Sequence, residues 1–296
     1  MMDFGSVLTA MVTPFNQKGE IDFNKTTILV DYLIENGTEG LVIAGTTGES
    51  PTLSASEKLE LFKHVVDVAN KRVPVIAGTG SNDTASSIVL TKQAQACGVD
   101  AIMLVSPYYN KPSQQGLYKH FEQIAGETSL PIMLYNIPGR SVVNMEADTI
   151  IRLSQIDNIV SVKEASGDLD QVATIIENTS STFSVYSGDD GLTLPMLSIG
   201  AIGIVSVASH IIGNEMNRMV KEFKEGNVSN AANIHRRFLP VMKGLFNYPS
   251  PTPVKYALQR KGLECGGVRL PLVALSKDEQ KVIDDVIKRD LYFKKA

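Results

Sequence analysis

Residues 40–69 read GLVIAGTTGESPTLSASEKLELFKHVVDVA, a short apolar run followed by an amphipathic stretch. The run 40–45 has the length and the Val/Ile content of a strand that is buried on both faces. Ser54 and Glu57 form a capping box, so we expect a helix that begins there and packs an apolar stripe from Leu59 onward against the strand. The stretch therefore predicts one parallel β-loop-α unit.

Similar units recur along the chain. Apolar runs, each followed by a helical pattern, occupy residues 6–13, 40–45, 73–78, 101–107, 131–136, 159–164, 183–188 and 201–207. An open doubly wound sheet has the same local pattern, but eight units spaced by about thirty residues favour a closed barrel. We predict an α/β protein with a (β/α)8 TIM barrel, whose active site lies at the C-terminal ends of the strands.

The β pattern stops near residue 226. Three helical stretches follow, at residues 229–246, 253–261 and 277–293. We therefore predict two regions, a barrel over residues 1–225 and an appended C-terminal helical layer over residues 226–296.

Composition and charge exclude several classes of partner. The 28 basic and 32 acidic residues give a net charge of -4, without the basic surface that nucleic acid or an anionic membrane attracts. Residues 1–12 lack a positively charged leader and are too short to span a bilayer. Two cysteines without CxxC spacing fit a reducing compartment. We expect a cytoplasmic protein that binds neither nucleic acid nor membrane.

Metal ligands are not grouped in the sequence. The four histidines lie far apart and show no paired ligand spacing. Asp189 and Asp190 could ligate a hard cation, but an aspartate after a glycine at the start of a helix is typical of an N-cap. We predict no metal site.

Lys163 ends the apolar run 159–162 of the predicted sixth strand. Burial at such a position lowers the pKa of a lysine from its usual value of about 10.4, so that the neutral amine becomes a nucleophile near pH 7. A neutral amine attacks a ketone to form an imine, which is an electron sink for carbon-carbon bond formation. The structural alternative is a lysine paired with Glu164 or another carboxylate.

Other strands also end in polar side chains. Tyr135 could relay the protons of imine formation, or it could be a core tyrosine with a satisfied hydroxyl. Thr46 and Thr47 lie on a Gly-flanked turn that could bind a carboxylate and extend the proton path. Arg140 follows Pro-Gly and could hold a substrate carboxylate through two hydrogen bonds, or form a surface ion pair.

Taken together, these motifs resemble the dihydrodipicolinate synthase and N-acetylneuraminate lyase family. The resemblance covers nearly the whole chain. Its motifs are 45–50 (GTTGES), 107–110 (PYYN), 135–138 (YNIP) with Arg140, 162–165 (VKEA), 187–190 (SGDD), 253–255 (PVK) and 269–272 (RLPL). The double threonine, the Tyr-Tyr-Asn turn and the arginine are similar to the dihydrodipicolinate synthase branch, which implies a lyase that condenses pyruvate with aspartate semialdehyde in diaminopimelate and lysine biosynthesis.

The resemblance also implies the catalytic roles. Lys163 would hold pyruvate as a Schiff base without any further cofactor, and Tyr135 would transfer protons. Thr46 would link Tyr135 to Tyr109, which in the family reaches the site of a neighbouring subunit. The implied assembly is a homo-oligomer, a tight dimer paired into a tetramer.

Four further residues would bind substrate. The resemblance implies that Thr47 binds the pyruvate carboxylate and that Arg140 attracts the aspartate semialdehyde carboxylate. Backbone atoms of Gly188 and Val205 would border the amine.

Lys58 and Ser86 depart from the family pattern. They stand where relatives that lysine inhibits tend to carry His and Glu, which implies an altered feedback pocket and weak inhibition by lysine.

Three other functions remain open at this stage. A sister pyruvate-dependent aldolase acting on a sugar acid would keep Lys163 and Tyr135, although Arg140 argues against it. A catalytically silent scaffold would keep only the fold. A barrel isomerase would hold phosphate near the seventh and eighth runs, where Gly188, Gly191, Gly200 and Gly203 cluster.

Overall fold

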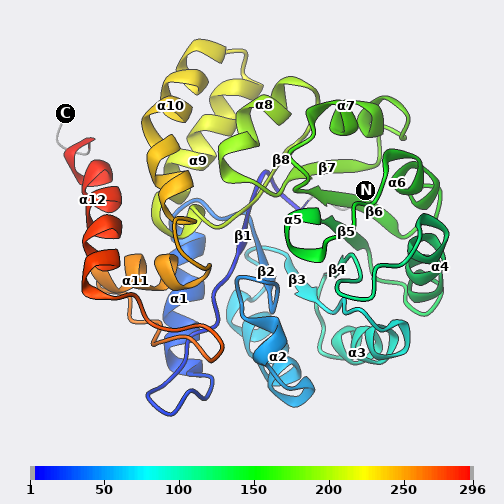
Figure 1. Cartoon of the computed structure of the whole chain (residues 1–296), viewed down its shortest axis with the longest axis horizontal. Coiled ribbons are helices and arrows are strands. Elements are labelled where there is room, and N and C mark those ends of the chain that lie inside the picture. The colour runs from blue at the N-terminus through cyan, green and yellow to red at the C-terminus, as the bar shows by residue number, and fades with distance from the viewer. Residues whose placement is uncertain (1–3, 294–296) are drawn as a thin grey trace.

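The computed structural model describes residues 4–293, and its eight strands close into one parallel barrel in chain order (Figure 1). Leu8 on the first strand pairs with Val205 on the last, which closes the ring. The strands are β1 (Val7–Ala10), β2 (Gly40–Ile43), β3 (Val75–Gly78), β4 (Ala101–Val105), β5 (Ile132–Asn136), β6 (Ile159–Glu164), β7 (Ser184–Ser187) and β8 (Gly203–Ser206). The predicted barrel is confirmed, and the open doubly wound sheet is excluded.

Helices between the strands form an outer layer (Figure 1). The predicted capping box is present, because the Glu57 N–H donates to the Ser54 hydroxyl (3.2 Å) and the Ser54 N–H donates to the Glu57 carboxylate (2.9 Å). The helical elements before β8 are α1 (Phe23–Glu35), η1 (Ser50–Thr52), α2 (Ala55–Ala69), α3 (Thr84–Ala96), α4 (Gln114–Ala125), α5 (Pro138–Ser141), α6 (Ala147–Leu153), α7 (Leu169–Glu177), η2 (Asp190–Leu192) and α8 (Thr193–Ser198).

Several predicted runs extend past the observed strands. β2 ends at Ile43 rather than at residue 45, because Ala44 adopts a left-handed φ of 49° and turns the chain out of the ladder. Likewise, the run 6–13 contributes only Val7–Ala10 to the sheet. Residues after β2, β3, β4 and β5 instead contribute to the cavity described below.

Two apolar clusters form the core. The smaller one fills the ring with side chains such as Met103, Tyr135 and Tyr186, and the larger one lies between the strands and the helices. Successive side chains of a strand point to opposite faces. On β6, Lys163 therefore faces the ring interior and Glu164 faces the helices.

The C-terminal part of the chain is helical, as predicted. α9 (Ser209–Lys224) is followed by α10 (Val228–Gly244), α11 (Thr252–Arg260) and α12 (Lys277–Phe293), which lie on one side of the barrel (Figure 1). α10 packs against α9, and α12 packs against α10 and α11. The division into two regions at residue 226 stays a prediction. No helix within residues 4–293 has the length and apolar character needed to cross a membrane.

Candidate active site

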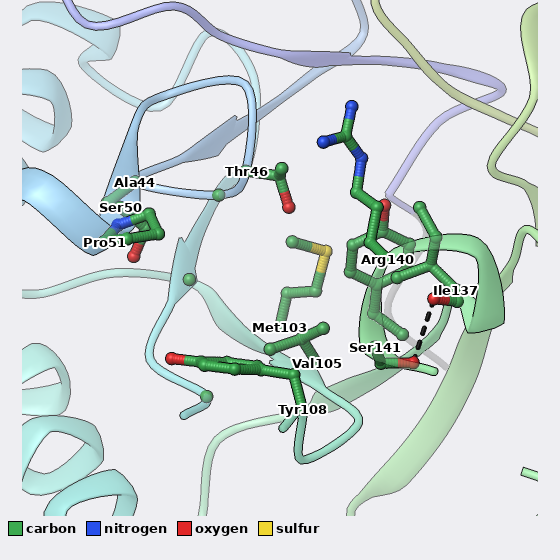
Figure 2. Close-up of a pocket in the computed structure, with 14 residues that line it drawn as sticks. Ala44, Thr46, Ser50, Pro51, Met103, Val105, Tyr108, Ile137, Arg140 and Ser141 are labelled. Atoms are coloured by element: carbon green, nitrogen blue, oxygen red, sulfur yellow. Dashed lines mark hydrogen bonds between the residues drawn. The ribbon is translucent and has the colours of Figure 1, made fainter. Parts of the chain in front are cut away.

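A cavity of about 230 Å³ opens among the loops that follow the strands (Figure 2). Its walls come from the segment after β2, from the end of β3 and the residues that follow, from β4 and its loop, and from β5 with α5. The lining residues are Ala44, Gly45, Thr46, Ser50, Pro51, Gly78, Gly80, Met103, Val105, Tyr108, Tyr135, Ile137, Arg140 and Ser141. The cavity thus lies where a (β/α)8 barrel carries its active site.

Lys163 lies level with two tyrosines inside the ring. Its register partners are Tyr135 on β5 and Tyr186 on β7. The lysine is 5% exposed, and its Nζ is 4.1 Å from the centroid of the Tyr135 ring. The pKa of Lys163 is lowered from 10.5 to about 7, chiefly by burial; Asp190 opposes this shift and Arg140 contributes to it. At neutral pH a large fraction of the amine is therefore in its nucleophilic form.

Glu164 faces away from this amine. Its carboxylate accepts hydrogen bonds from the side-chain amides of Asn136 (3.0 Å) and Gln171 (3.1 Å) and from the Ser166 N–H (2.6 Å). Burial raises the pKa of Glu164, and these hydrogen bonds oppose the increase. The proposed structural pairing of Lys163 with Glu164 is therefore wrong, because strand alternation separates the two side chains.

Asp190 is the carboxylate that acts electrostatically on Lys163. It is 2% exposed and accepts hydrogen bonds from the Ser206 hydroxyl (2.5 Å), the Val207 N–H (3.2 Å) and the Ala208 N–H (3.0 Å). Burial raises the pKa of Asp190, while these hydrogen bonds lower it. Residues at the end of β8 thus fix Asp190, a second buried titratable group, where its charge acts on Lys163.

Tyr135 connects Lys163 to the cavity. Its ring forms part of the cavity wall and also packs against the lysine amine. Burial raises the pKa of the phenol to about 12, with Arg140 and Thr46 opposing the increase. The hydroxyl is therefore protonated at neutral pH and can pass a proton on. Figure 2 shows the Thr46 side chain pointing into the space between Met103 and Arg140.

Three of the eight predicted site residues line the cavity, namely Thr46, Tyr135 and Arg140. Lys163 and Thr47 are buried and do not form part of its walls. Lys163 contacts Tyr135, which does line the cavity.

Gly188 packs against Lys163, and the roles of Gly188 and Val205 beside the amine stay predictions. A Cβ atom added to Gly188 would lie 3.2 Å from the Lys163 Cε and 2.7 Å from the Ala165 Cβ, so a side chain here would displace its neighbours. Val205 faces the ring interior in the same apolar cluster as Tyr135.

Tyr109 is not brought to the cavity of its own chain. The side chain is 89% exposed, and φ is 73°, a left-handed conformation that a bulky residue rarely adopts. The adjacent Tyr108 lines the cavity instead. This position leaves Tyr109 available to another subunit, and the oligomer stays a prediction.

Asp189 and Gly203 have structural roles. Asp189 caps η2 by accepting a hydrogen bond from the Gly191 N–H (2.8 Å), and it pairs with Lys243 (3.2 Å). Gly203 packs so closely that an added Cβ would lie 2.1 Å from the Ser6 carbonyl oxygen. No group of three or more His, Cys, Asp or Glu side chains within the described residues could hold a metal ion. Close packing accounts for glycines that could otherwise indicate a phosphate site.

A second cavity, of about 460 Å³, lies between α2 and α3. Lys58 and Ser86 both line it, and burial lowers the pKa of Lys58. Gly80 lines this cavity and the first one, so the two adjoin. The two residues that depart from the family pattern are therefore together in space.

Several cavity residues were not found from the sequence. Met103 and Val105 occupy alternate positions of β4, so strand alternation could have placed them. Ser141 was not predicted to line the cavity. Its hydroxyl lies 2.9 Å from the carbonyl oxygens of both Ile137 and Val143 and donates to one or the other, which holds the turn that carries Arg140 (Figure 2).

Comparisons with known proteins identify the family of this chain. The model of the Dihydrodipicolinate synthetase family matches residues 3–290. The chain is 63% identical to 4-hydroxy-tetrahydrodipicolinate synthase 2 of Halalkalibacterium halodurans, over 97% of this chain and 99% of that protein. It is 59% identical to 4-hydroxy-tetrahydrodipicolinate synthase of Bacillus subtilis, with the same coverage. The crystal structure of dihydrodipicolinate synthase DapA-2 from Bacillus anthracis superposes with a TM-score of 0.96 at 58% identity, over 97% of this chain and 99% of that one.

The barrel, the buried lysine and these relatives define an enzyme, a lyase built on a (β/α)8 barrel. The chain belongs to the Dihydrodipicolinate synthetase family, and the family predicted from its motifs is confirmed.

Proposed function

We propose that this lyase condenses pyruvate with L-aspartate semialdehyde to give 4-hydroxy-tetrahydrodipicolinate, in the cytoplasm, as the first committed step of diaminopimelate and lysine biosynthesis. The observation that carries the proposal is the buried Lys163 amine, whose pKa is lowered to about 7 beside the Tyr135 ring. The names of relatives at 59% and 63% identity support the choice of substrates.

The first half of the reaction forms the nucleophile. The neutral Lys163 amine adds to the keto carbon of pyruvate, and the keto oxygen leaves as water once Tyr135 has supplied a proton. Thr47 binds the pyruvate carboxylate during this step. Loss of a proton from the methyl group then converts the imine to an enamine.

The second half forms the new bond and releases the enzyme. The enamine carbon attacks the aldehyde carbon of aspartate semialdehyde, and the aldehyde oxygen takes a proton to become a hydroxyl. The substrate amine then adds to the imine carbon, and the Lys163 amine leaves with a proton. Nothing is oxidised or reduced overall, so the proposed reaction needs no organic cofactor.

The active assembly in this proposal is a tight homodimer paired into a tetramer. The 89% exposure of Tyr109 supports it, because this side chain lies outside the cavity of its own chain and is available to a neighbouring subunit.

Trapping of the imine tests the function directly. The purified protein is incubated with pyruvate and sodium borohydride, which reduces an imine to a stable secondary amine, and the product is analysed by intact-mass spectrometry and peptide mapping. We expect a mass gain confined to the peptide that contains Lys163. No adduct, under conditions that label a control aldolase, would refute the Schiff-base mechanism.

Arg140→Ala is expected to weaken binding of the acceptor rather than of pyruvate. Loss of a charged hydrogen-bond partner costs about 1.5 to 3 kcal/mol, so the apparent KM for aspartate semialdehyde should rise roughly 10- to 100-fold. Steady-state kinetics with each substrate varied in turn measure this. Arg72→Ala removes a surface arginine paired with Asp31 and should leave both KM values unchanged. Equal effects of Arg140→Ala on both substrates would remove its assigned role.

Inhibition by lysine is expected to be weak. The cavity between α2 and α3 contains Lys58, whose positive charge disfavours a cationic amino acid. Initial rates at increasing lysine concentration test this expectation. Half-maximal inhibition at submillimolar lysine would contradict it.

A further inference from the structure

Three charged residues that the proposed catalytic steps do not use meet in one cluster. They are Glu49 in the 45–50 loop, Lys255 on α11, and Arg269 in the segment after α11. Glu49 and Lys255 are 206 positions apart in the sequence, yet their side chains are only 1% and 3% exposed. We call this cluster the latch.

Glu49 connects the latch to the loop 45–50, which carries Thr46 and Thr47. Its backbone N–H donates to the Thr46 carbonyl oxygen (3.0 Å), so the two residues belong to one hydrogen-bonded turn. Glu49 also has a left-handed φ of 58°, which is strained for a residue with a side chain. Such a conformation persists only where surrounding contacts over-determine it.

Lys255 supplies one of these contacts. Its Nζ lies 2.6 Å from the Glu49 carboxylate, donates to the Gly267 carbonyl oxygen (2.7 Å), and lies 4.2 Å from the centroid of the Phe15 ring. Because both charges are buried, neither can exchange its partner for water without a large cost.

Arg269 supplies further contacts to Glu49 and to its surroundings. Its backbone N–H donates to the other carboxylate oxygen of Glu49 (2.9 Å). Its guanidinium donates to the carbonyls of Gly19 (2.8 Å) and Thr52 (2.6 Å) and pairs with Glu57 at the start of α2. The C-terminal segment thus contacts the loop 45–50 through Glu49 and also contacts the start of α2, the helix that follows this loop.

We propose that Glu49 and Lys255 are positioning residues, through which the C-terminal helical layer holds the Thr46-Thr47 turn in its reactive conformation. The turn contributes directly to the cavity, because Thr46 and its neighbours from 44–51 make up five of the fourteen lining residues. This inference rests on the proposed function, since it assigns pyruvate binding and proton relay to that turn.

The test compares Lys255→Met, Glu49→Gln/Lys255→Met and Glu49→Asp with the wild type. Lys255→Met leaves the Glu49 carboxylate buried without its cation and should lower the melting temperature, whereas the double variant removes both charges and should recover it. Activity should not recover with it. In both variants we expect kcat/KM for pyruvate to fall by about 10- to 100-fold, the scale of a misplacement of about 1 Å.

A positioning role predicts a larger change in the KM for one substrate than in the KM for the other. The apparent KM for pyruvate should rise more than that for aspartate semialdehyde, because Arg140 lies on a different loop. Glu49→Asp keeps both charges and shortens the arm by one methylene group, so it should show the same KM pattern with a stability close to that of the wild type. Lys92→Met removes an exposed ion pair with Glu127 and should leave kcat and both KM values unchanged.

Two results would overturn the proposal. One is recovery of activity together with stability in the double variant, which indicates a purely structural ion pair. The other is an unchanged pyruvate KM in Glu49→Asp. If Lys255→Met does not fold, the double variant and Glu49→Asp still test the proposal. Borohydride trapping of the wild type separates the two proposals, because an absent Lys163 adduct refutes the function itself.

Discussion

Lys163→Met is expected to abolish turnover and to stabilise the fold. The substitution keeps the length of the side chain but removes the amine that forms the imine, so kcat should fall by roughly 10⁴-fold or more, as when other enzymes lose a covalent nucleophile. Borohydride should then trap no pyruvate adduct. An adduct of undiminished yield on another peptide would show that Lys163 is not the nucleophile.

The gain in stability follows from the pKa of Lys163. It lies at about 7 in the folded protein and near 10.5 when the chain is unfolded, so the unfolded state binds the proton more tightly. The lysine therefore destabilises the fold fully below about pH 7, and this penalty disappears as the pH rises toward 10.5. Each pKa unit corresponds to about 1.4 kcal/mol, so removing the amine should stabilise by a few kcal/mol at neutral pH.

Thermal unfolding at several pH values measures this effect. The melting temperature of Lys163→Met should exceed that of the wild type by about 5 to 10 °C near pH 7, and the difference should shrink toward pH 10. Lys119→Met replaces an exposed lysine paired with Glu122 and should shift the melting temperature little at any pH. A difference that does not depend on pH would mean that burial does not lower the pKa of Lys163.

The barrel was predictable because each of its strands is buried on both faces and reads as an apolar run. Lys163 was predictable for a related reason, since a charged residue directly after such a run must lie at the strand end that carries active sites. The bounds of the strands were less accurate. A left-handed turn such as the one at Ala44 depends on close packing that a single sequence does not reveal.

The surroundings of the Lys163 amine could not be predicted from the sequence. Lys163 and Glu164 are adjacent in sequence, and only the closed barrel shows which of them faces inward. The sequence marks Asp190 only as a candidate cation ligand. Its effect on Lys163 could not be predicted, because its burial and the hydrogen bond that it accepts from Ser206 depend on β8 closing against β7. The contact of Glu49 with Lys255 spans most of the chain, beyond the reach of any local pattern.

Tyr135→Phe carries the second large effect, a loss of roughly 10²- to 10⁴-fold in kcat/KM, the range attributed to positioned proton transfer. Phenylalanine keeps the ring that packs against Lys163 at 4.1 Å and removes only the hydroxyl. The phenol has a pKa raised to about 12, so it is present as a proton donor throughout the neutral range. Imine formation and release should therefore slow, while borohydride still traps the pyruvate adduct after long incubation.

Tyr186→Phe is the matched control for this prediction. Tyr186 is also buried inside the ring as a register partner of Lys163, but its hydroxyl donates to the Gly5 carbonyl oxygen (3.0 Å) ahead of β1, at the opposite end of the barrel. Its loss should cost about 0.5 to 1.5 kcal/mol of stability and leave kcat within a few-fold of the wild type. If the two variants lost activity equally, the effect of Tyr135 would come from packing, and the proton relay would have to lie elsewhere.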